Sequence, residues 1–125
     1  MYASSITTVV VKGGIGLISS DIIRGYNDTI ILSLLLEEPS YGYEISRTIR
    51  QRTDGQYVIK ETTLYSAFNR LEGNGFIESF SGTESQGKPR TYYRITEAGK
   101  QYYREKCAEW AVTQTVINRF VKEMN

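Results

Sequence analysis

Short hydrogen-bonding side chains recur on one face of the stretch Lys60–Ile77. Thr62, Ser66 and Asn69 are spaced three or four residues apart, so they fall on the same side of a helix, and Arg70 follows them. Such side chains exchange hydrogen bonds with base edges in the DNA major groove, and arginine also pairs with phosphate. The pattern therefore favours recognition of a nucleic acid. An ordinary solvent-exposed helix is the alternative, and this stretch alone does not separate the two.

The composition gives little support to catalysis. The 125 residues contain no histidine and one cysteine, Cys107, which removes the common zinc-ligand sets and the Ser-His and Cys-His nucleophile pairs. We expect no enzyme activity, no metal and no cofactor. The formal net charge is +1, so any affinity for DNA must come from local placement of cations or from a dimer. With no membrane-length apolar run and no signal peptide, the cytoplasm is the expected location.

The polar face needs a buried opposite face to hold it. Leu64, Phe68 and Leu71 recur at helical spacing and predict that face. Asn74-Gly75 then supplies the left-handed residue with which many helices end. The stretch is therefore predicted to be a short helix whose outward side is polar.

A second helix is predicted just before it. Ser40 is a candidate cap for a helix from Tyr41 to about Arg50, with Ile45 and Ile49 facing the core. Residues 57–59 form a short extended link between the two helices. Two helices joined in this way predict a helix-turn-helix.

The period of the apolar pattern changes to two after Gly75. Phe76–Phe80 and Thr91–Ile95 are predicted strands, and the polar segment Ser81–Pro89 between them is predicted to be a long turn. Lys88 and Arg90 make the returning side of this hairpin basic. A basic hairpin directly after a helix-turn-helix predicts a wing suited to phosphate contacts.

An earlier helix is predicted to begin at Ser19 or Ser20 and to end at Glu37-Glu38-Pro39. Its apolar stripe is wider than one buried face requires, which favours a second contact with a neighbouring molecule. The stripe comprises Ile22, Ile23, Tyr26, Ile30, Ile31, Leu34 and Leu35. Residues 1–19 are interpreted as a flexible extension, or as a strand that can pair with a partner.

A long final helix is predicted from Glu97 to about Lys122, with Thr96 as its cap. A helix of this length, roughly 39 Å, cannot bury its apolar residues against so small a head. Those residues are Tyr103, Cys107, Trp110, Ala111, Ile117, Phe120 and Val121. A symmetric homodimer through the first and last helices is therefore expected.

Taken in this order, the motifs resemble those of the PadR family of winged-helix transcriptional regulators. The resemblance covers about Asp21 to the C-terminus. It rests on Tyr41-Gly-Tyr-Glu-Ile45, Thr63-Leu-Tyr65, Arg70-Leu-Glu72 with Gly75 and Ile77, Glu84-Ser-Gln-Gly87 and Arg90-Thr-Tyr-Tyr-Arg-Ile-Thr-Glu-Ala-Gly99. It implies an α+β fold in which three helices and a two-stranded β wing form a winged helix-turn-helix head, followed by a long C-terminal dimerisation helix.

The resemblance also implies a dimeric repressor that binds double-stranded operator DNA and is released by a small aromatic ligand. The expected DNA-binding residues are Tyr41, Lys60, Thr62, Thr63, Tyr65, Ser66, Asn69, Arg70, Lys88 and Arg90. The expected ligand-binding residues are Trp110, Gln114, Lys106, Gly25, Thr29 and Ser33. Trp110 is either a platform for the ligand or an anchor of the dimer interface.

Two features depart from the family pattern. Lys60 stands where related proteins often have a Ser or Asn cap, so Thr62 or Thr63 must cap the helix or the cap is lost. Lys106 adds positive charge beside Trp110, which favours an anionic or neutral aromatic ligand over a cationic one.

The expected organisation has three parts. Residues 1–19 are an N-terminal extension, residues 20–96 the DNA-binding domain, and residues 97–125 the C-terminal dimerisation helix. A winged-helix module that contacts proteins and does not bind DNA is the alternative function, because the net charge is nearly neutral. A small-molecule-binding dimer is a further alternative.

Overall fold

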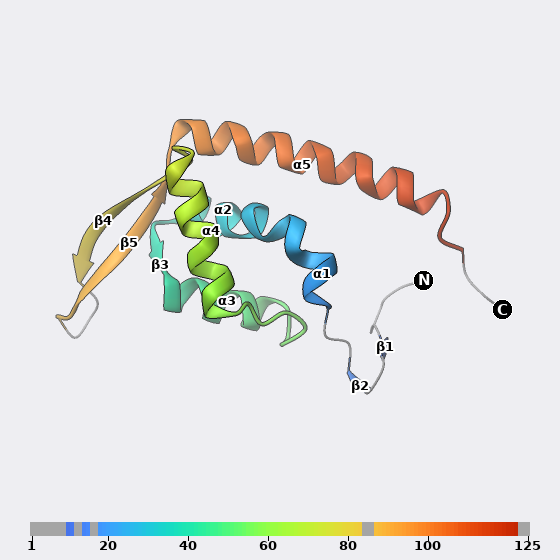
Figure 1. The fold of residues 1–125 in the computed structure, drawn as a ribbon, viewed down its shortest axis with the longest axis horizontal. Coiled ribbons are helices and arrows are strands. Elements are labelled where there is room, and N and C mark those ends of the chain that lie inside the picture. Colours follow the sequence, from blue (N-terminus) through green and yellow to red (C-terminus); the bar gives the residue numbers. More distant parts are fainter. Residues whose placement is uncertain (1–9, 12–13, 16–17, 84–86, 123–125) are drawn as a thin grey trace.

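The computed structural model describes residues 10–11, 14–15, 18–83 and 87–122 (Figure 1). Its elements are β1 (Val10–Val11), β2 (Gly14–Ile15), α1 (Ser20–Ile23), the 3-10 helix η1 (Arg24–Tyr26), α2 (Asn27–Glu37), β3 (Ser40–Tyr41), α3 (Gly42–Arg52), α4 (Glu61–Gly73), β4 (Ile77–Thr83), β5 (Pro89–Ile95) and α5 (Glu97–Asn118). The predicted winged helix-turn-helix head followed by a long helix is confirmed.

The core of the head lies between α2, α3, α4 and the sheet. Phe68 of α4 is fully buried, and its ring stacks on that of Tyr93 in β5, with ring centres 4.1 Å apart. The spacing of the buried residues on α4 is the one expected from the sequence. The buried residues are Ile31, Leu32, Leu34, Leu35, Ile45, Ile49, Tyr57, Ile59, Leu64, Ala67, Phe68, Leu71, Ile77 and Tyr93.

Helix α4 ends where Asn74-Gly75 predicts. Gly75 has a positive φ of 79°, and its amide donates to the carbonyl of Glu72 over 3.0 Å. The amide of Phe76 reaches back to the carbonyl of Leu71 over 2.9 Å. These two bonds form a Schellman motif, which satisfies the last carbonyls of the helix and turns the chain into β4.

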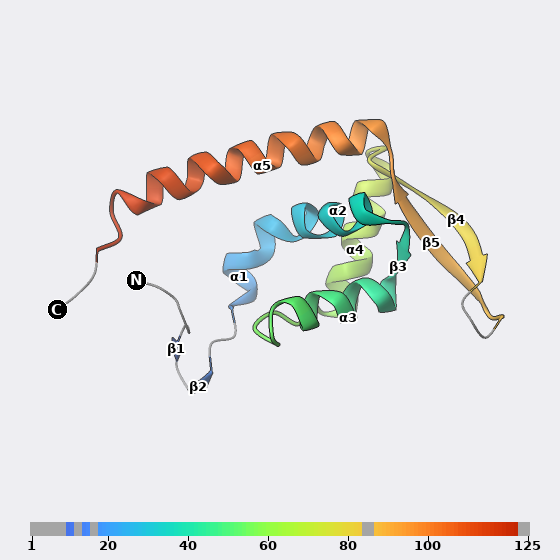
Figure 2. The same ribbon diagram turned by 180° about the vertical axis from the view of Figure 1, so that it is seen from behind.

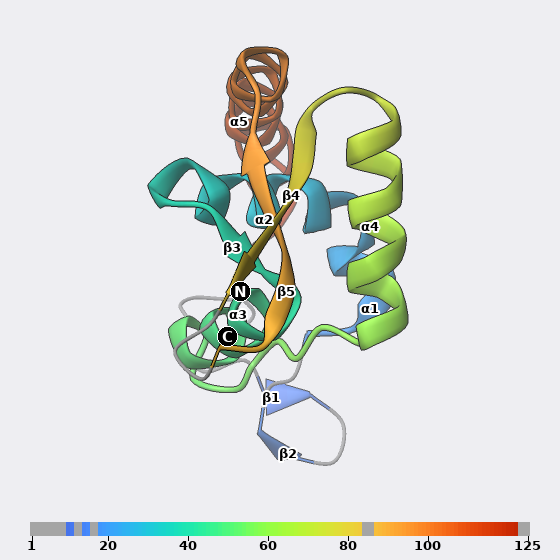
Figure 3. The ribbon, with the colours of Figure 1, turned by 90° about the vertical axis from the view of Figure 1, so that its left-hand side faces the viewer.

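The wing contains one strand more than expected. The sheet has the order β3-β5-β4 and is antiparallel throughout, with Ser40 opposite Tyr93 and Ile77 opposite Ile95 (Figure 3). Ser40 is therefore a strand residue, and the prediction that it caps α3 is wrong: Tyr41 holds the N-cap position. The open edge of β5 offers backbone partners, and pairing with them displaces the cap.

The hairpin strands are also longer than predicted. They extend to Thr83 and from Pro89, so part of the expected turn is paired backbone. The residues of these outer pairs are mostly small or polar and do not alternate with apolar ones, so the sequence pattern does not mark them as strand. Residues 84–86 lie outside the described residues.

The first predicted helix is divided into α1, η1 and α2. Ser19 caps α1 as predicted, since its hydroxyl accepts from the amide of Ile22 over 3.3 Å. The tighter 3-10 turn then spans Gly25, a residue with low helix propensity. The prediction of one continuous helix is therefore wrong. After the break, Asn27 faces the core with 4% of its surface exposed.

Helix α5 begins as predicted and ends earlier. The Thr96 hydroxyl accepts from the amide of Gly99 over 3.0 Å and donates to the carbonyl of Gly75 over 2.7 Å. The helix ends at Asn118 instead of near Lys122. It runs along α2 and projects beyond the head (Figures 1 and 2). Among its described residues only Gly99 is buried.

The N-terminal segment is described only in part. Val10 pairs with Ile15 and Val11 with Gly14 in a small antiparallel ladder. The described part of the segment thus contains two short paired strands, and residues 1–9, 12–13 and 16–17 of the expected extension lie outside the described residues. Next along the chain, the Ile18 amide donates to the carbonyl of Gln56 over 2.9 Å, which ties the entry of α1 to the link before α4.

The start of α5 leaves no room for a side chain, which gives a test of the fold. A Cβ at Gly99 would lie 2.0 Å from the carbonyl oxygen of Phe76. We expect Gly99→Ala to lower the free energy of unfolding by about 1–3 kcal/mol, because the neighbour is backbone and cannot rotate away. Urea unfolding at fixed protein concentration measures the change. Gly73→Ala is the control, since no atom lies within 4 Å of its added Cβ; equal losses in both variants would contradict this packing.

Candidate nucleic-acid interface and ligand pocket

The outward face of α4 is polar and exposed. Thr62, Ser66 and Asn69 point away from the core, because they lie opposite Leu64, Phe68 and Leu71 on the helix. They form a row about 10 Å long at 1.5 Å rise per residue. Figure 3 shows α4 along one side of the molecule, beside the wing. The helix thus presents hydrogen-bonding groups to an external partner, as the sequence predicts.

The flank of α4 nearer α2 behaves differently. Thr63 is half-buried and lines a hollow of about 470 Å³ with Lys60, Arg24 and Ser20. Arg70, also expected to contact DNA, forms an ion pair with Asp28 of α2. That hydrogen bond raises the pKa of Arg70. Thr63 and Arg70 therefore lie beside the outward row and do not belong to it.

The start of α4 has no side-chain cap. Lys60 holds the N-cap position, and neither it nor any other described side chain accepts a hydrogen bond there. The possibility that Thr62 or Thr63 replaces the missing cap is therefore not realised. Amides of the first turn of α4 therefore have no side-chain acceptor among the described residues, and Lys60 stands at the N-cap position before them.

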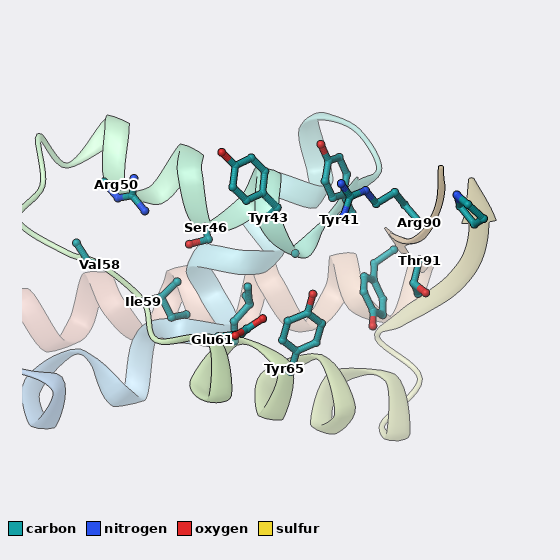
Figure 4. A pocket seen from close by; sticks show the side chains of 14 residues that line it. Tyr41, Tyr43, Ser46, Arg50, Val58, Ile59, Glu61, Tyr65, Arg90 and Thr91 are labelled. Carbon is teal, nitrogen blue, oxygen red and sulfur yellow. The ribbon is translucent and has the colours of Figure 1, made fainter. Parts of the chain in front are cut away.

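A groove of about 610 Å³ lies between α3, α4 and β5 (Figure 4). Two expected residues line it: Tyr65 from α4 and Tyr41 at the start of α3. Figure 4 shows side chains of α3 and α4 facing each other across the groove, with Arg90 at the wing end. Arg90 lies over the Tyr41 ring, with its guanidinium carbon 5.3 Å from the ring centre. The wing and the helix-turn-helix therefore form one continuous surface.

Tyr65 contacts both the core and the groove. Its ring packs edge-on against Phe68, with ring centres 5.4 Å apart, while 43% of the residue stays exposed. Its hydroxyl approaches Gly42 so closely that a Cβ there would lie 2.4 Å from it. The ring is anchored in the core and the hydroxyl lies at the groove. Lys88 is exposed on the wing.

Several groove residues were missed by the sequence reasoning, namely Tyr43, Ser46, Arg50, Glu61 and Thr91. Tyr43, Ser46 and Arg50 share one face of α3 at spacings of three and four, and this signal was available. Two other arginines of α3, Arg47 and Arg52, form ion pairs with Glu44 and Glu37, whereas Arg50 lines the groove.

Four of the six expected ligand-binding residues meet at one pocket. Gly25, Thr29, Lys106 and Trp110 line a hollow of about 260 Å³ between η1, α2 and α5. Gln114 lines an adjoining apolar groove of about 620 Å³, whereas Ser33 reaches neither, and its hydroxyl donates to the Ile30 carbonyl. Tyr26, which was not expected here, meets Trp110 edge-on with ring centres 5.1 Å apart.

The charge expected from Lys106 is offset inside this pocket. Its ammonium group lies 3.1 Å from a carboxylate oxygen of Glu109, and this hydrogen bond raises the pKa of Lys106. Glu109 also lines the pocket. The two charges cancel, so Lys106 does not by itself favour an anionic ligand.

Large apolar side chains stay exposed around the adjoining groove. Ile22 is 66% exposed, Trp110 44% and Ile117 50%. All three line the groove between α1 and α5. Contiguous exposed apolar surface of this kind marks a site of contact with another molecule.

These features define a class. A helix-turn-helix followed by a wing, with an exposed polar face on the second helix of the motif, is the architecture of a winged-helix DNA-binding protein. None of the helices in the described ranges is both long and apolar enough to cross a bilayer.

The family follows from comparison with known proteins. Residues 31–105 match the family described as transcriptional regulator PadR-like. This match covers more than half of the 125 residues, and the chain therefore belongs to the PadR-like family of transcriptional regulators. The resemblance read from the sequence is confirmed. The family is one of DNA-binding regulators and not of enzymes.

Individual relatives agree with this assignment. The chain is 49% identical over 106 residues to an uncharacterised protein from Lysinibacillus sphaericus, covering 85% of this chain and 97% of that one. A solved transcriptional regulator from Clostridium thermocellum has 66% identity and a TM-score of 0.78, over 85% of this chain and all of that chain. A PadR family transcription regulator from Clostridium difficile has 36% identity and a TM-score of 0.69, over 78% of this chain and all of that chain.

Proposed function

We propose that the protein is a homodimeric repressor that binds operator DNA through α4 and the wing. The observation that carries the proposal is the exposed row of Thr62, Ser66 and Asn69 beside a continuous groove that contains Arg50 and Arg90. Threonine and serine pair with several base edges, and asparagine pairs with adenine. Lys60 at the start of α4 and Lys88 and Arg90 on the wing supply phosphate contacts.

Local placement of cations resolves the problem of the low net charge. Among the described residues, seven acidic side chains pair with basic ones, namely Asp21, Asp28, Glu37, Glu44, Glu78, Glu97 and Glu109. Lys60, Arg50 and Lys88 have no such carboxylate among the described residues. A dimer presents these groups twice, which doubles the number of phosphate contacts on one duplex.

The first prediction concerns the outward row. We expect replacement of Thr62, Ser66 and Asn69 together by alanine to weaken operator binding at least tenfold, because base contacts of this kind are each worth about 1–3 kcal/mol. Fluorescence anisotropy with an operator selected from random duplexes measures the affinity. Thr115→Ala, on the exposed face of α5, is the control and should bind as wild type. If the triple variant bound the operator with wild-type affinity, the proposal that α4 contacts the operator bases would be wrong.

The phosphate contacts have their own signature. We expect operator affinity to fall steeply with salt, and Lys60→Ala or Lys88→Ala to reduce the slope of log K against log salt by about 1 each. Titrations at several salt concentrations give the slope. A slope near zero for the wild type would contradict the phosphate contacts, and no binding even at low salt would favour a module that does not bind DNA.

The dimer is proposed to form through the apolar groove between α1 and α5. A partner's α5 would cover Ile22, Trp110 and Ile117, and the two α4 helices would enter successive major grooves about 34 Å apart. We expect Ile117→Asp to convert the dimer to a monomer at micromolar concentration, because the carboxylate would be buried without a partner. Sedimentation velocity measures the change. Thr115→Asp is the matched control on the opposite side of α5, and a dimer in both variants would exclude this interface.

The ligand is proposed to bind against the rings of Tyr26 and Trp110, which line the same pocket. Flat aromatic molecules stack on such rings, and release of DNA requires that the ligand bind better to the DNA-incompetent state. We expect 9-aminoacridine, a planar cation, or anilinonaphthalene sulfonate, an anion, to quench Trp110 and to lower operator affinity. Trp110→Leu should abolish the effect of the probe on the operator. Probe-dependent release that persists in this variant would place the ligand elsewhere.

A further inference from the structure

Four consecutive residues, Tyr26–Thr29, connect the Trp110 pocket with the helix proposed to read DNA. Tyr26 and Thr29 line the pocket on one side of this stretch. Asn27 and Asp28 between them face the other way and bind residues near the two ends of α4. The stretch lies at the junction of η1 and α2, where the helix changes from 3-10 to α geometry.

Asn27 holds the entry to α4. Its side-chain oxygen accepts a hydrogen bond from the Tyr57 hydroxyl over 2.5 Å, and both residues are buried, with 4% and 8% exposed. Tyr57 lies three residues before the N-cap of α4. Burial raises the pKa of Tyr57, so the hydroxyl stays protonated and remains a donor. This buried hydrogen bond holds the link before α4 in place, because separating the two groups would leave each of them buried without a hydrogen-bond partner.

Asp28 holds the far end of α4. Its carboxylate pairs with the guanidinium of Arg70 in the last turn of the helix, across 42 residues of sequence. The Asp28 side chain is only 16% exposed, whereas that of Arg70 is 51% exposed. Asp28 also lies in the first turn of α2, where the helix dipole stabilises a carboxylate. Asp28 is therefore the less exposed partner of the pair, and α2 stabilises its charge.

We propose that Asn27 and Asp28 are positioning residues that hold both ends of α4 against the wall of the Trp110 pocket, so that occupancy of the pocket and DNA binding are linked through Tyr26–Thr29. The inference rests on the proposed function. A change at the Tyr26–Trp110 contact moves the first turn of α2, which carries both anchors. Asn27 and Asp28 lie outside residues 31–105, the part of the chain that matches the family.

Linkage is reciprocal, and this makes the proposal testable without an effector. If the pocket alters DNA binding, then DNA binding must alter the pocket. Trp110 is the single tryptophan of the chain and lines that pocket, so its emission reports the change. We expect the emission to shift when the wild-type dimer is saturated with the selected operator.

Asp28→Asn is the test variant, since it keeps the size of the side chain and removes the charge that holds Arg70. We expect the operator affinity to fall about three- to tenfold and the emission change at saturating operator to fall by at least half. Glu37→Gln is the matched control. Glu37 is also a carboxylate of α2 that binds an arginine of another helix, Arg52, over 2.7 Å, and it does not line the pocket. It should behave as wild type in both measurements.

Two further variants separate positioning from general stability. Arg70→Gln should reproduce Asp28→Asn, and the double variant should be no worse than either single one, because both remove the same contact. Tyr57→Phe removes only the hydroxyl that binds Asn27 and should also weaken the emission change. Urea unfolding of each variant should remain cooperative, which excludes a simple failure to fold.

The outcomes are distinct. Operator binding by the wild type without any change in Trp110 emission would overturn the inference and leave the proposed function intact. The inference would also be overturned if Asp28→Asn showed the same operator affinity and the same change in Trp110 emission as the wild type. Absence of operator binding by the wild type at low salt would overturn the proposed function, and the inference with it.

Discussion

Burial of one face of α4 is the constraint on which the rest of the structure depends. Phe68 is fully buried and stacked on Tyr93, and Leu64 and Leu71 are buried beside it. Burying side chains of this size contributes about 1.5–3 kcal/mol each to the free energy of folding, whereas the polar residues on the opposite side stay exposed to solvent. The core therefore sets the rotation of the helix about its axis. Thr62, Ser66 and Asn69 face outward because the apolar residues cannot.

The same packing explains why some polar residues of α4 belong to the outer surface and others do not. A helix presents about three sides: one is taken by the core, and one flank meets α2. Arg70 lies on that flank and forms an ion pair with Asp28, so its charge is neutralised within the protein. Tyr65 lies on the other flank, where its ring reaches Phe68 and its hydroxyl reaches the groove. Residue type alone does not distinguish an exposed polar side chain of α4 from one that pairs with another helix of the same molecule.

This difference also marks how far the sequence predicts the structure. Periodic features are local, and the spacing of Leu64, Phe68 and Leu71, the stop at Gly75 and the cap at Thr96 were all predicted correctly. The third strand and the Asp28–Arg70 pair were not, because each depends on segments distant in sequence that meet only after folding. The break at Gly25 was also missed, although its glycine is a local signal. The Lys106–Glu109 pair is different. It lies at a spacing of three on one helix and was available to sequence reasoning.

Helix α2 contacts both the core of the head and the groove beside α5. Its buried residues Ile31, Leu32 and Leu35 join it to the core beneath α4, while Thr29 and Ile30 face the groove that α5 borders. Any partner that covers α5 therefore rests on the helix that also supports α4. A rigid element shared by two surfaces transmits a displacement of one to the other, since a close-packed core moves as a unit and is not continuously deformable. The Tyr26–Trp110 contact lies at the irregular start of α2, directly before Asn27 and Asp28, so a displacement there would act first on the two residues that contact Tyr57 and Arg70.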